Sequence, residues 1–182
     1  MGKGSFFALL LVSAAVAAGL FGALHNQLSY SVGASYFHDF KFAQFGVPGD
    51  LHNRLGAALV GWRASWWVGL LVGLPAFLLG LFLMARPQAY LAAGLGAIFA
   101  VVMLTLLASG TGLFIGMTLA DAAMLQDIPI PDGVTDRAGF VRAGLMHDAS
   151  YIGGALGLIL ALVIVWRAAR AERALLNARK TP

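Results

Sequence analysis

Four long apolar stretches dominate the sequence. They run from about residue 5 to 24, from 62 to 84, from 89 to 119 and from 143 to 166. The first stretch, from Ser5 to Leu24, carries no charged residue. As a helix it would be about 30 Å long, which is enough to cross the hydrocarbon core of a bilayer. Since backbone polar groups inside a bilayer must be hydrogen bonded within the protein, the sequence predicts an all-α, integral membrane four-helix bundle.

The composition favours the same environment. Hydrophobic residues make up 60% of the 182 residues and charged residues only 11%, whereas soluble domains are roughly 25% charged. Because so few charged residues cannot form the surface of a soluble protein, lipid must surround much of this one. The chain has no cysteine, which excludes disulfides and cysteine-ligated metal centres. The basic residues flank apolar stretches, so we predict contact with membrane lipids and no nucleic-acid partner.

The distribution of charge predicts an orientation. One side would hold Lys3, Arg86, Arg167, Arg170, Arg173, Arg179 and Lys180. The other would hold fewer basic residues, namely Lys41, Arg54, Arg63, Arg137 and Arg142, with the acidic Asp39, Asp50, Asp121, Asp127, Asp132, Asp136 and Asp148. Because cytoplasmic flanks are enriched in Lys and Arg, we expect a multi-pass protein of the bacterial inner membrane with both termini, including the tail 167–182, in the cytoplasm. A cleavable signal peptide has a shorter apolar region, of about 7–15 residues, so the first stretch is expected to be retained.

Residues 25–60 and 121–142 are expected to form a cap on the outer face of a single domain. Five aromatic residues in the first segment show no helical or strand period, and glycine and proline bracket them: Tyr36, Phe37, Phe40, Phe42 and Phe45. We predict a loop or short helix that wedges these rings between the helix tops. Asp50 fits the N-cap of a helix beginning near Leu51. Pro75 predicts a kink in the second span, and glycine pairs such as Gly112 and Gly116 predict close packing within the chain.

The four histidines are predicted to lie on the outer side. His25 ends the first apolar stretch and His147 begins the fourth, so counting back from the inner charges places both at a similar depth. His147 and Tyr151 are four residues apart and share a helix face. Asp148 is the acid at the top of that span, with Arg63 and Arg142 as expected partners. His38 and His52 are interpreted as surface or capping residues rather than ligands.

These residues suggest a binding site on the outer face. The candidate lining residues are His25, Tyr30, Lys41, Gln44, His147, Asp148 and Tyr151. The ligand is left open between a small molecule, a lipid head group and a metal. Two facing histidines could ligate a b-type haem, or a divalent metal together with Asp148, although no zinc signature of fixed spacing is present. The competing interpretation is that these polar side chains anchor the helices at the head-group level.

Three blocks of the sequence carry a resemblance. HNQLSYSV…YFHDFKFAQFG, ASWWVGLLVGLP and MHDASYIGG together resemble an uncharacterised bacterial family of small four-helix integral membrane proteins, over most of the chain except residues 121–142. The resemblance implies a bacterial origin. It also assigns to the family pattern His25, Tyr30, Lys41, Gln44, Trp66, His147, Ser150 and Tyr151. It implies no activity.

Three functions are therefore compatible with the sequence. The first is a polytopic inner-membrane protein with a His/Tyr/Lys pocket on the outer, periplasmic face. The second is a structural or assembly subunit that docks other membrane-protein subunits through its aromatic segment. The third is an intramembrane metal-dependent hydrolase that uses His147 as ligand or base. GxSxG, Walker and dinucleotide motifs are absent, and no carboxylate pair lies in mid-span, which argues against a P-loop enzyme and a secondary transporter.

Overall fold

The computed structural model describes residues 2–118 and 127–179. Its long helices are α1 (Lys3–Val32), α3 (Arg54–Leu83), α4 (Pro87–Thr118) and α6 (Arg137–Ala178). Three short elements connect α1 to α3: the π-helical turn η1 (Phe37–Lys41), α2 (Phe42–Gln44) and the 3₁₀ turn η2 (Gly49–Leu51). All regular structure in the described part of the chain is helical, which confirms the predicted all-α bundle. Each of the four long helices is long and apolar enough to cross a membrane.

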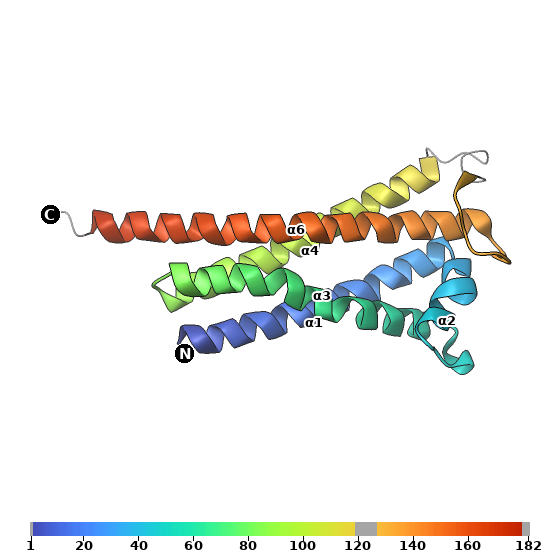
Figure 1. Cartoon of the computed structure of the whole chain (residues 1–182), viewed down its shortest axis with the longest axis horizontal. Helices are drawn as coiled ribbons and strands as arrows, with labels where there is room; N and C mark the ends of the chain where they lie inside the picture. Colours follow the sequence, from blue (N-terminus) through green and yellow to red (C-terminus); the bar gives the residue numbers. More distant parts are fainter. Residues whose placement is uncertain (1, 119–126, 180–182) are drawn as a thin grey trace.

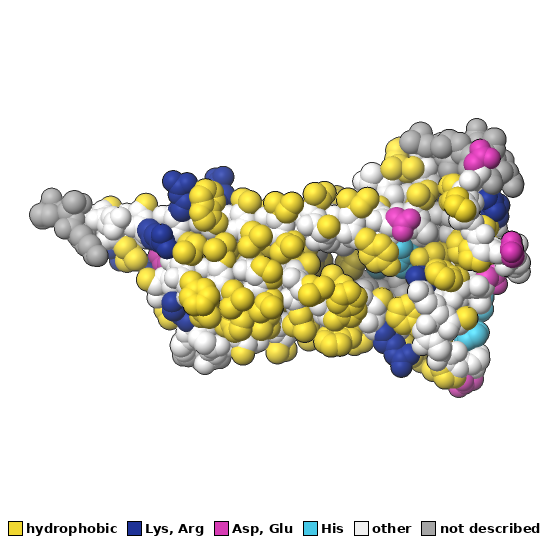
Figure 2. All heavy atoms as spheres, viewed as in Figure 1, with side chains coloured by type: hydrophobic (Ala, Val, Ile, Leu, Met, Phe, Trp, Pro, Cys, Tyr) yellow, Lys and Arg dark blue, Asp and Glu magenta, His cyan; other side chains and the backbone are white. Residues whose placement is uncertain are grey.

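The bundle has two chemically different ends (Figure 1). The start of α1, the α3–α4 turn and the end of α6 lie at one end, here called the termini end. The elements η1, α2 and η2 lie at the other, here called the cap end. Figure 2 shows acidic and histidine side chains gathered toward the cap end, with an apolar belt between the two ends. Asp121 and Lys180, which were predicted to lie on opposite sides of the membrane, are not among the described residues.

The helices extend beyond the apolar stretches of the sequence at the cap end. Helix α1 continues to Val32, and α6 already begins at Arg137. Asn53, not Asp50, caps α3: its side-chain oxygen accepts hydrogen bonds from the backbone N–H of Leu55 at 2.8 Å and of Gly56 at 3.4 Å. The prediction for Asp50 was wrong because residues 49–51 form a separate 3₁₀ turn, which leaves Asn53 as the last residue before the helix.

The helices pack as two tight pairs, α1 with α3 and α4 with α6. At the first crossing, a Cβ atom on Gly22 would overlap the carbonyl oxygen of Gly61, and the reverse is also true. At the second, a Cβ on Gly112 would overlap the carbonyl oxygen of Leu145. Small residues allow such backbone contact between apolar helices. The glycines therefore pack helices of this chain against one another, as predicted for Gly112.

Two hydrophobic cores join the pairs, one at each end. The termini-end core includes Leu10, Phe77, Tyr90 and Val165. The cap-end core contains Tyr36, Phe37, Phe42, Val47, Ala57, Val60, Phe140 and Ala143. Phe37 and Phe42 are fully buried, so the aromatic segment is a short helical insertion that wedges its rings between the helix tops, as its composition predicts.

Charged side chains fasten the termini end. Lys3 donates from Nζ to the carbonyl oxygens of Leu81, at 2.8 Å, and Met84, at 2.9 Å. Both residues lie at the C-terminal end of α3, where backbone carbonyls have no N–H partner within the helix. The buried carboxylate of Glu172 accepts hydrogen bonds from the backbone N–H groups of Ala85 and Arg86, each at 2.8 Å. The α3–α4 turn is thus held by side chains from both α1 and α6.

We expect Glu172→Ala to destabilise the bundle, because it leaves two N–H groups of the turn without an acceptor. A fully buried stranded group costs about 1–3 kcal/mol, and because Ala85 and Arg86 are exposed, water partly replaces the lost acceptor and the loss should be smaller. The measurement is reversible unfolding of the purified protein in mixed micelles of increasing denaturing-detergent content. Glu172→Gln retains one acceptor oxygen and should lose less stability. Equal stability of the alanine variant and the wild type would contradict this role.

A second prediction concerns Asp39, which ties the segment before α6 to η1. Its carboxylate accepts hydrogen bonds from the backbone N–H of Thr135, at 2.9 Å, and from the Thr135 hydroxyl, at 2.8 Å. These bonds lower the pKa of Asp39. The contact therefore contributes fully above the ordinary aspartate pKa and is lost as pH falls through the lowered value.

Hydrogen exchange checks this linkage. In the wild type, the protection factor of the Thr135 amide should fall as the pH is lowered from about 5 through the lowered pKa of Asp39. In Asp39→Asn, the protection factor of the Thr135 amide should be lower than in the wild type at about pH 5, and it should not change with pH. A wild-type protection factor that stays constant over the range would show that the carboxylate does not hold this segment.

Candidate functional site

Two buried histidines meet at the cap end of the bundle. His25 comes from α1 and His147 from α6, and their ring centroids are 4.6 Å apart with the ring planes perpendicular. Their side chains are only 9% and 7% exposed. The two helix crossings place them: His25 lies one turn beyond Gly22, and His147 lies two residues beyond Leu145. The structure therefore brings together the two histidines that the sequence placed at a similar depth.

Each ring is held by a serine from another helix. Ser29 Oγ of α1 lies 3.2 Å from His147 Nε2, and Ser109 Oγ of α4 lies 3.1 Å from His25 Nδ1. Neither serine was predicted from the sequence. Ser29 follows His25 by four residues and shares its helix face, which was an available signal. Ser109 lies in mid-span between Thr105 and Thr111, whose hydroxyls bond back to their own helix, and only the packing of α4 against α1 reveals its contact with His25.

The second ring nitrogen of His25 has no partner. His25 Nε2 is buried and makes no hydrogen bond, although buried polar atoms are almost always paired. Since the Ser109 hydroxyl can donate or accept, His25 Nδ1 can be bare or protonated. In a neutral ring with a bare Nδ1, Nε2 carries the proton and is a donor. When Nδ1 carries the proton, Nε2 is an acceptor. In either tautomer this atom can bind a polar group.

A small chamber of about 50 Å³ adjoins the pair. His25, His147, Lys41 and Tyr151 are among the residues that line it. Lys41 is half-buried and is the charged residue of the chamber wall; its Nζ donates to Gln44 Oε1 at 2.9 Å and lies 4.5 Å from the centroid of the Phe40 ring. Burial lowers the pKa of Lys41, and the negative charge of Asp148 opposes this shift.

The other predicted site residues lie outside the chamber wall. The Tyr30 hydroxyl lies 2.8 Å from His38 Nε2, on a different part of the cap. Gln44 reaches the chamber only through Lys41. Asp148 is exposed and forms no ion pair with Arg63 or Arg142, so that expectation was wrong. Arg63 instead donates to the carbonyl oxygen of Phe45 and Arg142 to that of Gly116, because each reaches a backbone oxygen nearby.

The remaining histidines form a separate cluster. His52 stacks on Phe42 with centroids 4.6 Å apart, and its Nε2–H donates to the carbonyl oxygen of Val47 at 2.9 Å. The His38 ring lies 6.1 Å from His52. These contacts pack the cap, which agrees with the interpretation of both residues as structural.

The paired histidines do not fit a haem. Axial ligands must stand on opposite faces of the porphyrin, whereas these rings touch edge to face and leave no room for a plane between them. Within residues 2–118 and 127–179, no group of three or more His, Cys, Asp or Glu side chains could hold a metal ion. Asp148 does not complete such a group, because neighbouring side chains on a helix point about 100° apart.

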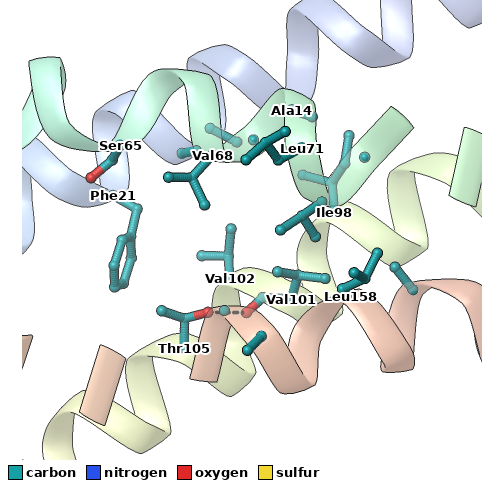
Figure 3. Close-up of a pocket in the computed structure, with 18 of the residues that line it drawn as sticks. Ala14, Phe21, Ser65, Val68, Leu71, Ile98, Val101, Val102, Thr105 and Leu158 are labelled. Atoms are coloured by element: carbon teal, nitrogen blue, oxygen red, sulfur yellow. Dashed lines mark hydrogen bonds between the residues drawn. The ribbon is translucent and has the colours of Figure 1, made fainter. Parts of the chain in front are cut away.

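An apolar cavity of about 350 Å³ lies between the two helix pairs, in the middle of the bundle. Figure 3 shows Phe21, Val68, Ile98 and Val102 around this space. The Thr105 hydroxyl at its edge is satisfied by the carbonyl oxygen of Val101, at 2.8 Å. The Ser150 hydroxyl similarly donates to the carbonyl oxygen of His147 at 2.7 Å. These two hydroxyls of the wall therefore already have acceptors within the protein.

Comparison of this chain with protein families, with curated proteins and with solved structures finds no match. The resemblance to a family of small four-helix membrane proteins therefore stays a prediction.

Proposed function

We propose that this chain is a multi-pass membrane protein that binds the polar group of a small organic ligand in the chamber beside His25 and His147. The buried, unpartnered Nε2 of His25 carries the proposal. An unpaired polar atom in a buried site costs free energy, and a ligand that bonds to it would recover that cost. Lys41 and Tyr151 supply further polar groups in the same wall.

The chemistry of the wall favours an organic polar group over a metal ion. The Lys41 ammonium and the Tyr151 hydroxyl are hydrogen-bond donors, and a protonated ammonium repels cations. The two imidazoles are the metal-type ligands of this wall, one fewer than the protein ligands of a usual catalytic zinc site. This composition counts against a metal-dependent hydrolase. The buried rings Tyr36, Phe37 and Phe42 face the cap-end core, which makes them unsuitable as a docking surface for another subunit.

The charge distribution supports an orientation. Lys3, Arg86, Arg167, Arg170 and Arg173 accompany the termini end, whereas the histidines and most described acidic residues accompany the cap end. Because cytoplasmic flanks are rich in Lys and Arg, the termini end is cytoplasmic and the chamber opens near the periplasmic face of a bacterial inner membrane.

The binding proposal predicts retention of a ligand that depends on His25. The protein is purified in a mild detergent and denatured, and the released small molecules are identified by mass spectrometry. A molecule present with the wild type should be reduced with His25→Ala, because the variant removes Nε2 from the chamber. His38→Ala is the matched control, since His38 lies in the cap but outside the chamber wall. Identical sets of molecules from all three proteins would count strongly against the proposal.

The orientation predicts the behaviour of reporters fused after Pro182. A fluorescent protein that matures only in the cytoplasm should fluoresce in that position. A phosphatase that is active only in the periplasm should be inactive there. An active phosphatase with a dark fluorescent fusion would reverse the orientation and place the chamber on the cytoplasmic side.

A further inference from the structure

The apolar cavity and the polar chamber adjoin each other. Five residues line both of them: Phe21, Ala64, Ser65, Ser150 and Tyr151. The polar part lies at the histidine pair near the cap, and the apolar part continues toward the middle of the bundle. A molecule that reaches from the chamber past these shared residues into the cavity would have a polar group at one end and an apolar body at the other.

The shape of the apolar part indicates a single hydrocarbon chain. On α6 its lining runs from Ser150 to Ala161, which is about 16 Å at the helical rise per residue. Dividing the volume of about 350 Å³ by that length leaves a mean cross-section of roughly 20 Å². So narrow a space favours one extended hydrocarbon chain over a lipid with two.

The polar part limits the head group. Its volume is only about 50 Å³, where a single water needs about 10–15 Å³, so a head group of only a few atoms fits. Lys41 is the charged residue that lines it, and its ammonium donates to a neutral acceptor, Gln44. Within the described residues Lys41 forms no direct ion pair, although the charge of Asp148, which lies outside the chamber wall, acts on it. A small anion would pair with Lys41 and accept a hydrogen bond from His25 Nε2–H, in the tautomer whose Nδ1 accepts from Ser109.

From this arrangement, and resting on the binding function proposed above, we propose that the ligand is a single-chain fatty acid. Its carboxylate lies between Lys41 and His25, and its chain fills the cavity between the α1–α3 and α4–α6 pairs. The pairs touch through cores at their two ends, which leaves this space between them. Leu71 and Tyr151, both in the wall, are 60% and 59% exposed. The space therefore reaches the surface of the bundle, and a chain can enter sideways from the bilayer.

The probe is palmitate that carries a photoactivatable diazirine near the end of its chain. It is added to the full-length protein in nanodiscs of uncharged phosphatidylcholine, and the labelled peptides are mapped after illumination. The proposal predicts labelling of cavity-lining residues such as Ala97, Ile98 and Ala161. Added unlabelled palmitate should reduce this labelling, and the part that it removes is here called competable labelling. Labelling confined to outward-facing residues such as Leu107 and Phe114 would show only contact with the bilayer and would overturn the proposal.

Gly154→Leu tests whether the chain occupies the cavity. Gly154 lines the cavity, and an added Cβ meets no atom within 4 Å, so a larger side chain should fill the space without disturbing the fold. Gly110→Leu is the matched control: it also has open space and is exposed, but lies outside the cavity wall. Competable labelling should fall about tenfold in Gly154→Leu, the change that corresponds to roughly 1.4 kcal/mol, and stay unchanged in Gly110→Leu.

Lys41→Met tests the head group. Competable labelling should again fall by about tenfold, because a charge-assisted hydrogen bond is typically worth that much or more. In the wild type, hexadecanol, which has the same chain without the charge, should compete much less well than palmitate. Equal competition by the two compounds would overturn the acidic head group.

The outcomes separate this inference from the proposed function. If Lys41→Met and His25→Ala weaken binding and Gly154→Leu does not, the chamber binds a polar group, but the chain does not fill the cavity, and the fatty-acid inference fails alone. If only Gly154→Leu weakens binding, the cavity holds a chain whose head lies elsewhere, and both proposals fail. If no variant changes the labelling, both fail as well.

Discussion

Backbone contact at two glycine crossings determines the geometry of the rest of the molecule. Gly22 and Gly61 bring α1 against α3, and Gly112 brings α4 against the carbonyl oxygen of Leu145 on α6. One turn beyond the first contact, the buried Asn26 side chain donates to the carbonyl oxygen of Ala57 at 2.9 Å, which fixes the rotation of α1 on α3. Because His25, Ser109 and His147 all lie within a turn of these contacts, the crossings place the histidine pair and one of its hydrogen-bond partners.

The two helix pairs are then joined in a different way. Aromatic rings inserted by η1 and α2 fill the cap end, whereas Lys3 and Glu172 fasten the α3–α4 turn at the termini end. Small side chains and glycines line much of the region between, and they do not fill it. The tight pairs and their two end clamps therefore leave a space of about 350 Å³ between them that opens sideways at the bundle surface, and the proposed ligand would occupy it.

Several parts of the site could be anticipated, and several could not. His25 and His147 were placed at one depth by counting residues from the charged ends, which needs only the helical rise. Lys41 was among the candidate lining residues, although its position in a π-helical turn was not foreseen. The ion pairs expected for Asp148 failed, because Arg63 and Arg142 found backbone acceptors and Asp148 remained exposed. Which donor meets which acceptor depends on the rotation of each helix, and residue types do not report that rotation.

The sequence by itself determined that the chain forms four long apolar helices and that its histidines gather at one end. These properties follow from stretch length and from the order of charges, which are local. Only the tertiary structure decided that the two rings touch, that Ser29 and Ser109 hold them, and that one ring nitrogen is left without a partner. The reason is physical: with 23 glycines, many close crossings are possible, and the choice among them depends on how the surfaces of whole helices fit.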